Sequence, residues 1–148
     1  MVAITLVLGV VANVTRVQRL AWWGQGNQPP QVDVDFHFLD VASADALRTS
    51  LPRVVFLDTR PSAVATVGRV PGASTVAYTD LAAALTADRL AELRQADAIV
   101  LYGSGGEGDI EQLLGQELHR RGLRPPYVLV GGFPAWEAAG LPTEGSAS

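Results

Sequence analysis

The 148-residue sequence contains no cysteine. This absence excludes a thiol nucleophile, a disulfide and a thiolate ligand for a metal ion. It leaves the redox compartment open, because a cysteine-free domain suits a reducing and an oxidising environment equally well. The two histidines, His37 and His119, lie far apart in the sequence and do not have the spacing of metal ligands. No metal site is therefore expected.

Lysine is also missing, so that all eleven basic residues are arginine, against fifteen acidic residues and a net charge of −4. The sequence has no basic stripe of the kind that a generic nucleic-acid binder shows, and no nucleic-acid partner is expected. A hydrophobic fraction of 48% is too high for a disordered chain, and the length favours one domain. No cofactor is predicted.

No apolar run reaches the roughly 20 residues that a helix needs to cross a bilayer. Residues 2–12 form an apolar stretch that stops at Asn13, and residues 20–23 resume it with two tryptophans, which suit a membrane interface. Three interpretations of residues 1–23 stay open: an apolar helix that anchors the chain at a membrane through residues 2–23, a secretory signal, or a helix that packs on its own domain. The expected location is a membrane of undetermined side, with the cytoplasm as the alternative.

Glycine, proline and hydrophobic periodicity divide the rest of the chain. Residues 24–31 are predicted to be a linker, residues 32–144 a folded domain and residues 145–148 a flexible tail. Within the domain the pattern predicts strands over 32–39, 54–57, 74–77, 98–102 and 127–130, and helices over 43–49, after Pro61, over 80–95 in two pieces around Thr86, over 109–121 and through Trp136. Ser43 is the expected cap of the first of these helices. Strands that alternate with helices predict an α/β domain with a mostly parallel sheet.

Two further details concern single helices. Val64 and Val67 are expected on the helix that begins at Pro61. In the helix over 109–121, the apolar residues are expected to share one face; they are Ile110, Leu113, Leu114 and Leu118.

Three motifs between residues 32 and 143 resemble those of the rhodanese-like domain family. They are Val-Phe-Leu-Asp-Thr-Arg at 55–60, Gly-Arg-Val-Pro-Gly-Ala at 68–73, and Val-Gly-Gly-Phe-Pro-Ala-Trp at 130–136 followed by Ala-Gly-Leu-Pro at 139–142. The resemblance implies a three-layer fold, with a mostly parallel five-stranded sheet flanked by helices. Asp58 and Arg60 are spaced to tie loops together, and Arg69 stands where the family has histidine; these three residues are expected to support the site.

The resemblance also implies an active-site loop after the strand over 98–102. In active rhodaneses this strand ends in the nucleophilic cysteine, and that position falls on Gly103 here. The candidate binding loop comprises Gly103, Ser104, Gly105, Gly106, Glu107, Gly108 and Asp109. Sulfur transfer through a cysteine persulfide and cysteine-based phosphatase chemistry are therefore not expected. Glu107 and Asp109 place negative charge where an anion would bind, which disfavours anions.

Three functional hypotheses follow. The first is a non-catalytic rhodanese-like module that binds, scaffolds or regulates a protein partner, tethered at a membrane. The alternative is a sulfurtransferase-related or other enzyme with altered chemistry in the loop 103–109. Its weakness is that Ser104 has no base nearby, since His119 lies about three helical turns along the next helix. The third is a protein whose missing cysteine comes from a partner chain. No small-molecule ligand is identified.

Overall fold

The structure is a computed structural model that describes residues 34–145. The predicted N-terminal helix over 1–23, the linker over 24–31 and residues 146–148 of the predicted tail lie outside the described residues. None of the helices within residues 34–145 combines the length and the hydropathy that crossing a membrane requires.

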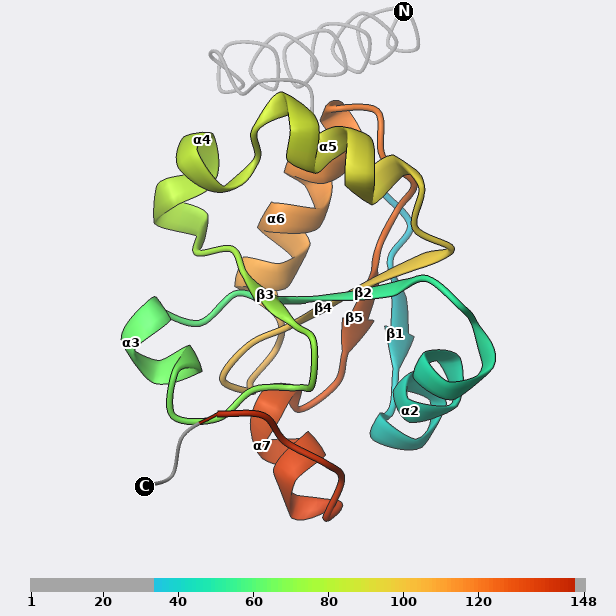
Figure 1. Cartoon of the computed structure of the whole chain (residues 1–148), viewed down its shortest axis with the longest axis vertical. Helices are drawn as coiled ribbons and strands as arrows, with labels where there is room; N and C mark the ends of the chain where they lie inside the picture. Colours follow the sequence, from blue (N-terminus) through green and yellow to red (C-terminus); the bar gives the residue numbers. More distant parts are fainter. Residues whose placement is uncertain (1–33, 146–148) are drawn as a thin grey trace, which may run out of the picture. The chain divides into compact units, whose positions relative to one another are not determined.

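Five parallel strands form one sheet in the order β1-β5-β4-β2-β3 (Figure 1). The strands are β1 (His37–Leu39), β2 (Val54–Asp58), β3 (Ser74–Thr75), β4 (Ala98–Tyr102) and β5 (Tyr127–Leu129). The predicted α/β class and five-stranded sheet are confirmed, and the sheet is wholly parallel. The outer strands β1 and β3 are shorter than the sequence pattern indicated.

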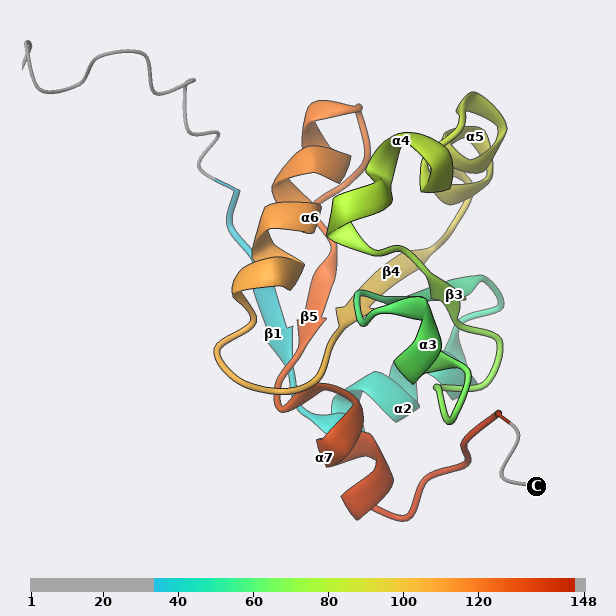
Figure 2. The same ribbon diagram turned by 90° about the vertical axis from the view of Figure 1, so that its left-hand side faces the viewer.

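Helices cover both faces of the sheet, as Figure 2 shows. They are α2 (Val41–Ser50), α3 (Ser62–Ala65), the 3-10 helix η1 (Tyr78–Asp80), α4 (Leu81–Ala84), α5 (Ala87–Arg94), α6 (Asp109–Arg120) and α7 (Gly132–Ala138). Residues of α2 and α7 pack on one face, and residues of α5 and α6 pack on the other. The result is the predicted three-layer arrangement.

The two central strands, β2 and β4, contribute side chains to both cores. Phe56 and Val100 belong to the cluster that contains α2 and α7, whereas Leu57 and Leu101 belong to the cluster under α5 and α6. Side chains alternate between the faces of a strand, so a strand covered on both faces needs apolar residues at every position. This is why β2 and β4 appear in the sequence as continuous apolar runs.

Trp136 of α7 is the largest fully buried side chain in the cluster that contains α2 and α7. Its side chain is completely buried, and its indole Nε1–H donates a hydrogen bond of 2.9 Å to the carbonyl oxygen of Pro142. The ring also meets Phe56 edge to face, with centroids 5.7 Å apart. The indole N–H thereby has a hydrogen-bond partner, and the ring packs between the sheet and residue 142.

Three helix boundaries test the predicted caps. The prediction of Ser43 as a helix cap was wrong, because α2 begins two residues earlier and its N-cap is Asp40. The Asp40 carboxylate accepts a 2.7 Å hydrogen bond from the Ser43 N–H. Hydrogen bonding with the Ser43 side chain, followed by this bond to its N–H, lowers the pKa of Asp40. Pro61 stands at the N-cap of α3, which ends before Val67. Thr86 divides α4 from α5 as predicted and caps α5.

Candidate functional site

The candidate site lies where β2 and β4 end. Asp58 and Tyr102 are register partners at the last position of each strand, so Thr59 and Gly103 emerge side by side. The Thr59 N–H donates a 2.9 Å hydrogen bond to the carbonyl oxygen of Tyr102. In Figure 2 the loop from β4 to α6 lies at the end of the sheet toward which the strands point. Ligands of open parallel sheets bind at this end.

Asp58 and Arg60 form a buried ion pair beside this loop. The Arg60 Nε–H donates to Asp58 Oδ1 at 2.9 Å, and Nη2 donates to Oδ2 at 2.6 Å and to the Gly68 carbonyl oxygen at 2.5 Å. The guanidinium also lies 4.1 Å from the centre of the Phe133 ring. Hydrogen bonding to Asp58 raises the pKa of Arg60. With these partners, Arg60 holds two loops together and its charge is compensated.

Tyr102 completes this buried cluster. Its phenol oxygen accepts a 3.1 Å hydrogen bond from the Val70 N–H, and its ring is fully buried. Burial is the main cause that raises the pKa of Tyr102, with the nearby Asp58 charge acting in the same direction. The phenol therefore stays neutral and serves as a fixed hydrogen-bonding group.

Arg69 lies away from the candidate binding loop and contacts Glu144. Its Nη2 lies 2.9 Å from Glu144 Oε1, and the Gly72 N–H donates to Glu144 Oε2 at 2.8 Å. The Gly72 hydrogen bond, followed by the contacts with Arg69, lowers the pKa of Glu144. The pair fastens residue 144 to the loop over 68–73 and does not join the residues of the binding loop.

Glu111 is the site residue that sequence reasoning missed. Its side chain is buried to 7% exposure, and its Oε1 accepts a 2.5 Å hydrogen bond from the Thr59 hydroxyl. A Cβ added to Gly103 would overlap this Oε1 and would lie 3.1 Å from the carboxylate carbon and 2.8 Å from the Thr59 hydroxyl oxygen. The Glu111 carboxylate thus occupies the space that a side chain at position 103 would need.

The buried face of α6 explains why this residue was missed. The buried residues of the helix are Glu111, Leu114, Gly115 and Leu118. The expectation that Ile110 and Leu113 share the apolar face was wrong, since they are 44% and 41% exposed. The helix is turned so that Gly115 meets Phe36, whose Cζ would lie 2.9 Å from a Cβ at position 115. The spacing of residues 111, 114, 115 and 118, a helical stripe interrupted by one carboxylate, was the signal that could have found Glu111.

A pocket of about 300 Å³ opens over this carboxylate. Of the predicted loop residues, the structure places five in its wall: Ser104, Gly105, Glu107, Gly108 and Asp109. Thr59, Arg60, Pro61, Ile110 and Glu111 complete the lining. Gly103 lies buried behind Glu111, and Gly106 is exposed outside the lining. Among the described residues no metal-binding group of three acidic or histidine side chains is present.

The start of α7 closes tightly on the loop. The Phe133 N–H donates a 2.8 Å hydrogen bond to the carbonyl oxygen of Gly103. Gly132, at a φ of +57°, has no room for a side chain because a Cβ there would lie 2.7 Å from the Gly105 nitrogen. The backbone of Gly103 therefore keeps a structural role in closing the domain.

The histidines do not complete a serine nucleophile. His119 Nδ1 lies 3.1 Å from the Leu123 carbonyl oxygen, at the far end of α6 from the loop, and His37 is an exposed residue of the outer strand β1. Neither lines the pocket that contains Ser104. A base within reach, which serine catalysis requires, is not supplied by either ring.

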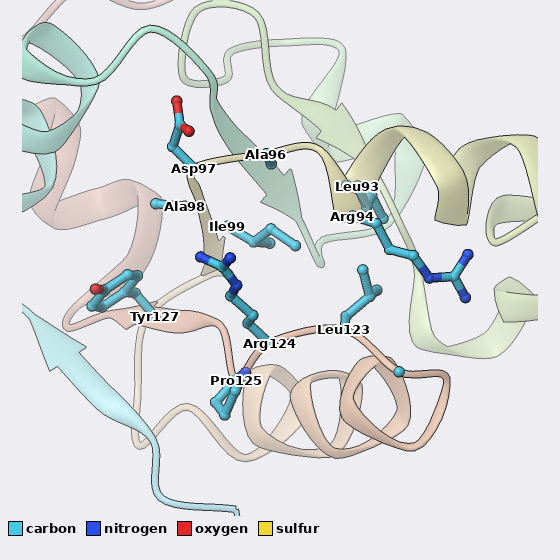
Figure 3. A pocket seen from close by; sticks show the side chains of 11 residues that line it. Leu93, Arg94, Ala96, Asp97, Ala98, Ile99, Leu123, Arg124, Pro125 and Tyr127 are labelled. Atoms are coloured by element: carbon cyan, nitrogen blue, oxygen red, sulfur yellow. The ribbon is translucent and has the colours of Figure 1, made fainter.

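A second pocket, of about 350 Å³, lies at the opposite end of the sheet (Figure 3). Ala98 and Tyr127, the first residues of β4 and β5, mark this end. Figure 3 shows the Arg124 side chain reaching toward Ile99, while Arg94 extends away from the centre. Although this pocket is slightly larger, it holds none of the residues of the rhodanese-like loop.

Comparisons with solved structures place this fold among known proteins. A thiosulfate sulfurtransferase from Pseudomonas aeruginosa is 28% identical at a TM-score of 0.60, over 84% of this chain but only 22% of that protein. A rhodanese-like domain from Anabaena sp. is 28% identical at a TM-score of 0.57, over 80% of this chain and 81% of that one. A Bacillus halodurans protein reaches a TM-score of 0.62 at 17% identity, over 74% of this chain and 77% of that one, and shows the fold alone.

Sequence comparison gives the family directly. No curated protein matches the chain. The family profile described as the rhodanese-like domain matches residues 41–139, a span that reaches from α2 to the end of α7. This span contains all three motifs, except for the last residues of the third, and the whole candidate loop. The chain belongs to the rhodanese-like domain family.

Proposed function

We propose that this chain is a rhodanese-like domain that does not transfer sulfur and instead acts as a binding module. The observation that carries the proposal is the relationship between Gly103 and Glu111. Position 103 has no side chain that could attack a substrate, and a buried carboxylate fills the space beside it. A negative charge at this place opposes the approach of thiosulfate or phosphate.

The remaining polar groups support the same conclusion. Arg60, the basic residue in the wall of the loop pocket, is already paired with Asp58 and the Gly68 carbonyl oxygen. An anionic substrate would have to compete with a buried carboxylate for this guanidinium. The pocket itself remains open to solvent and could receive a group from another protein, which is the kind of partner that we propose.

The test is a sulfurtransferase assay with thiosulfate and cyanide on the purified full chain. We expect thiocyanate formation to match the buffer blank, whereas an active rhodanese run in parallel must give turnover. A phosphatase assay with p-nitrophenyl phosphate should also match its blank. Thiocyanate turnover that scales with the concentration of this chain would overturn the proposal.

We also propose that residues 2–23 hold the module at a membrane. The support is the sequence itself, in which an apolar stretch over 2–12 is followed by arginines and paired tryptophans. Flotation of the full chain with lipid vesicles tests this. We expect co-flotation, and we expect Leu6→Asp combined with Leu8→Asp to abolish it because charges in the apolar stretch oppose insertion. Equal flotation of this variant would contradict the tether.

A further inference from the structure

We propose that the loop pocket binds a guanidinium group, supplied by an arginine side chain of a partner protein. The inference rests on the proposed function and names the chemistry of its ligand. In this view Glu111 does more than fill space: it supplies the carboxylate at the base of the pocket that recognises the incoming cation.

Only one of the two carboxylate oxygens of Glu111 has a hydrogen-bond partner in the protein. The side chain is 93% buried, from its exposed fraction of 7%, and its Oε1 is bonded to the Thr59 hydroxyl. Neither a hydrogen bond to Oε2 nor an ion pair to Glu111 occurs among residues 34–145. Within residues 34–145, Arg69 Nε is the one fully buried side-chain nitrogen or oxygen without a partner, so Glu111 Oε2 keeps contact with the solvent of the pocket, where an entering cation would pair with it. The N-terminus of α6 offsets only part of this charge.

The wall of the pocket carries a negative charge. Glu107 and Asp109 are exposed at the rim, and Glu111 lies within. The one basic lining residue, Arg60, is balanced by Asp58. The pocket therefore has a negative charge that attracts cations and repels anions. Its sign is the reverse of the one that an anion-binding rhodanese loop requires.

The arrangement of these carboxylates suits a guanidinium better than a metal ion. In the described part of the chain, these carboxylates do not converge as the ligands of a metal ion would. A guanidinium is planar and carries five N–H donors, so it can contact carboxylates that are spread around a pocket. A volume of about 300 Å³ leaves room for this group and part of its stem.

Exposed apolar side chains lie beside the pocket. Ile110 lines the pocket at 44% exposure, and Leu113, one helical turn further on α6, is 41% exposed. Apolar residues beside a charged recognition point suit a protein partner better than a free small cation, because they offer surface to be buried around the charged contact. The methylene stem of an arginine side chain can also cover Ile110.

The experiment uses the full chain labelled with nitrogen-15 and titrated with the capped peptide Gly-Arg-Gly. We expect saturable shifts of the amide signals of the loop glycines, Gly105, Gly106 and Gly108. Glu111→Gln keeps the shape of the side chain and removes its charge, and it should weaken binding at least about ten-fold, since hydrogen bonds to charged groups are the stronger ones. Glu137→Gln, an exposed change on α7, is the matched control and should leave the affinity unchanged.

A second variant covers the case in which Glu111→Gln does not fold, which circular dichroism will show. Glu107→Gln combined with Asp109→Asn alters only exposed residues of the rim. It should weaken binding several-fold and reduce the salt dependence of the affinity. The same peptide with glutamine in place of arginine should not bind, and thiosulfate should not shift the loop signals.

Four results would overturn the inference: no saturable shift with the arginine peptide, equal binding by the glutamine peptide, equal binding by a lysine peptide, or an unchanged affinity in folded Glu111→Gln. The sulfurtransferase assay separates this from the proposed function. A chain without turnover that also fails to bind the arginine peptide contradicts the ligand alone. Turnover contradicts the proposed function itself.

Discussion

The carboxylate carbon of Glu111 lies 3.1 Å from the point that a Cβ on Gly103 would occupy. A side chain at position 103 would need the space that the Glu111 carboxylate occupies in this domain. The absence of a nucleophile is therefore not only a change at position 103. It is coupled to a second residue on α6, eight positions further along the chain.

This coupling can be measured with a double-mutant cycle. Gly103→Ala should destabilise the domain by about 1–3 kcal/mol, because the added methyl group overpacks a filled site. In the Glu111→Ala background the same substitution should cost less, and the coupling free energy should fall between about 0.5 and 3 kcal/mol. Urea unfolding of the four proteins gives the values. Additive effects would show that the two residues do not share the space.

The same geometry predicts that restoring the cysteine alone is not enough. Gly103→Cys should show no sulfurtransferase turnover, because its side chain meets Glu111 and Thr59. A negative charge beside the sulfur would also raise the pKa of a thiol. Combining Gly103→Cys with Glu111→Ala removes the overlap with Glu111 and its negative charge and leaves only the close contact with Thr59, and any turnover should appear only in this double variant. Turnover in Gly103→Cys alone, measured with thiosulfate and cyanide, would refute this explanation.

Thr59 is expected to be the residue that keeps Glu111 in place. Thr59→Val retains the shape but removes the hydroxyl donor, and should destabilise the domain by about 1–3 kcal/mol because the buried carboxylate loses its hydrogen bond. Thr59→Ser keeps the donor and should recover most of this loss. Thr66→Val is a control in an exposed position, where the hydroxyl bonds to its own helical turn. If Thr59→Val unfolds at the same urea concentration as the wild type, the hydrogen bond does not contribute.

The buried ion pair should be far more important than a surface pair. Asp58→Asn leaves the Arg60 guanidinium buried without its counter-charge, and we expect a loss of about 3–5 kcal/mol. Asp45→Asn breaks the partly exposed pair with Arg48 on α2 and should cost about 1 kcal/mol or less. Thermal or urea unfolding compares them. Similar losses for both variants would contradict the structural role of Asp58.

Glu144 gives a prediction about acid. Its pKa in the folded chain is lowered by the Gly72 N–H and by Arg69. Its contribution to stability is therefore present above the unfolded value, near 4.5, and is lost as the pH falls through the folded pKa. Glu144→Gln should be less stable than the wild type at pH 7, and the difference should shrink in acid. A difference that stays constant down to pH 2 would contradict it.

Most of the fold followed from the sequence because its central elements are strongly determined by local pattern. β4 was predicted at its observed bounds, since a short continuous apolar run is typical of a strand covered on both faces. The division of the helical segment at Thr86 was also predicted, whereas the role of Thr86 as the N-cap of α5 comes from the structure. The failures occurred where tertiary contacts decide. Asp40 competed with Ser43 as a cap, and the rotation of α6 places Gly115 against Phe36, a residue far away in the sequence.

The site was predictable only in part for the same reason. The motif identified the loop and the missing nucleophile at Gly103, because both are linear features of the chain. Glu111 could not be placed by spacing along the loop, since its role depends on which face of α6 turns inward. The stripe of residues 111, 114, 115 and 118 was the available signal, and the packing of α6 shows that this stripe turns into the domain.

The shared volume also imposes an order on any change of these two positions. A side chain at residue 103 requires the glutamate at residue 111 to move, so the substitution is better tolerated after the glutamate has been shortened or removed than before. The carbonyl oxygen of Gly103 must meanwhile stay available to the Phe133 N–H. Directed evolution that randomises the loop alone should therefore favour glycine at position 103. Libraries that vary position 111 at the same time should also yield other residues at position 103.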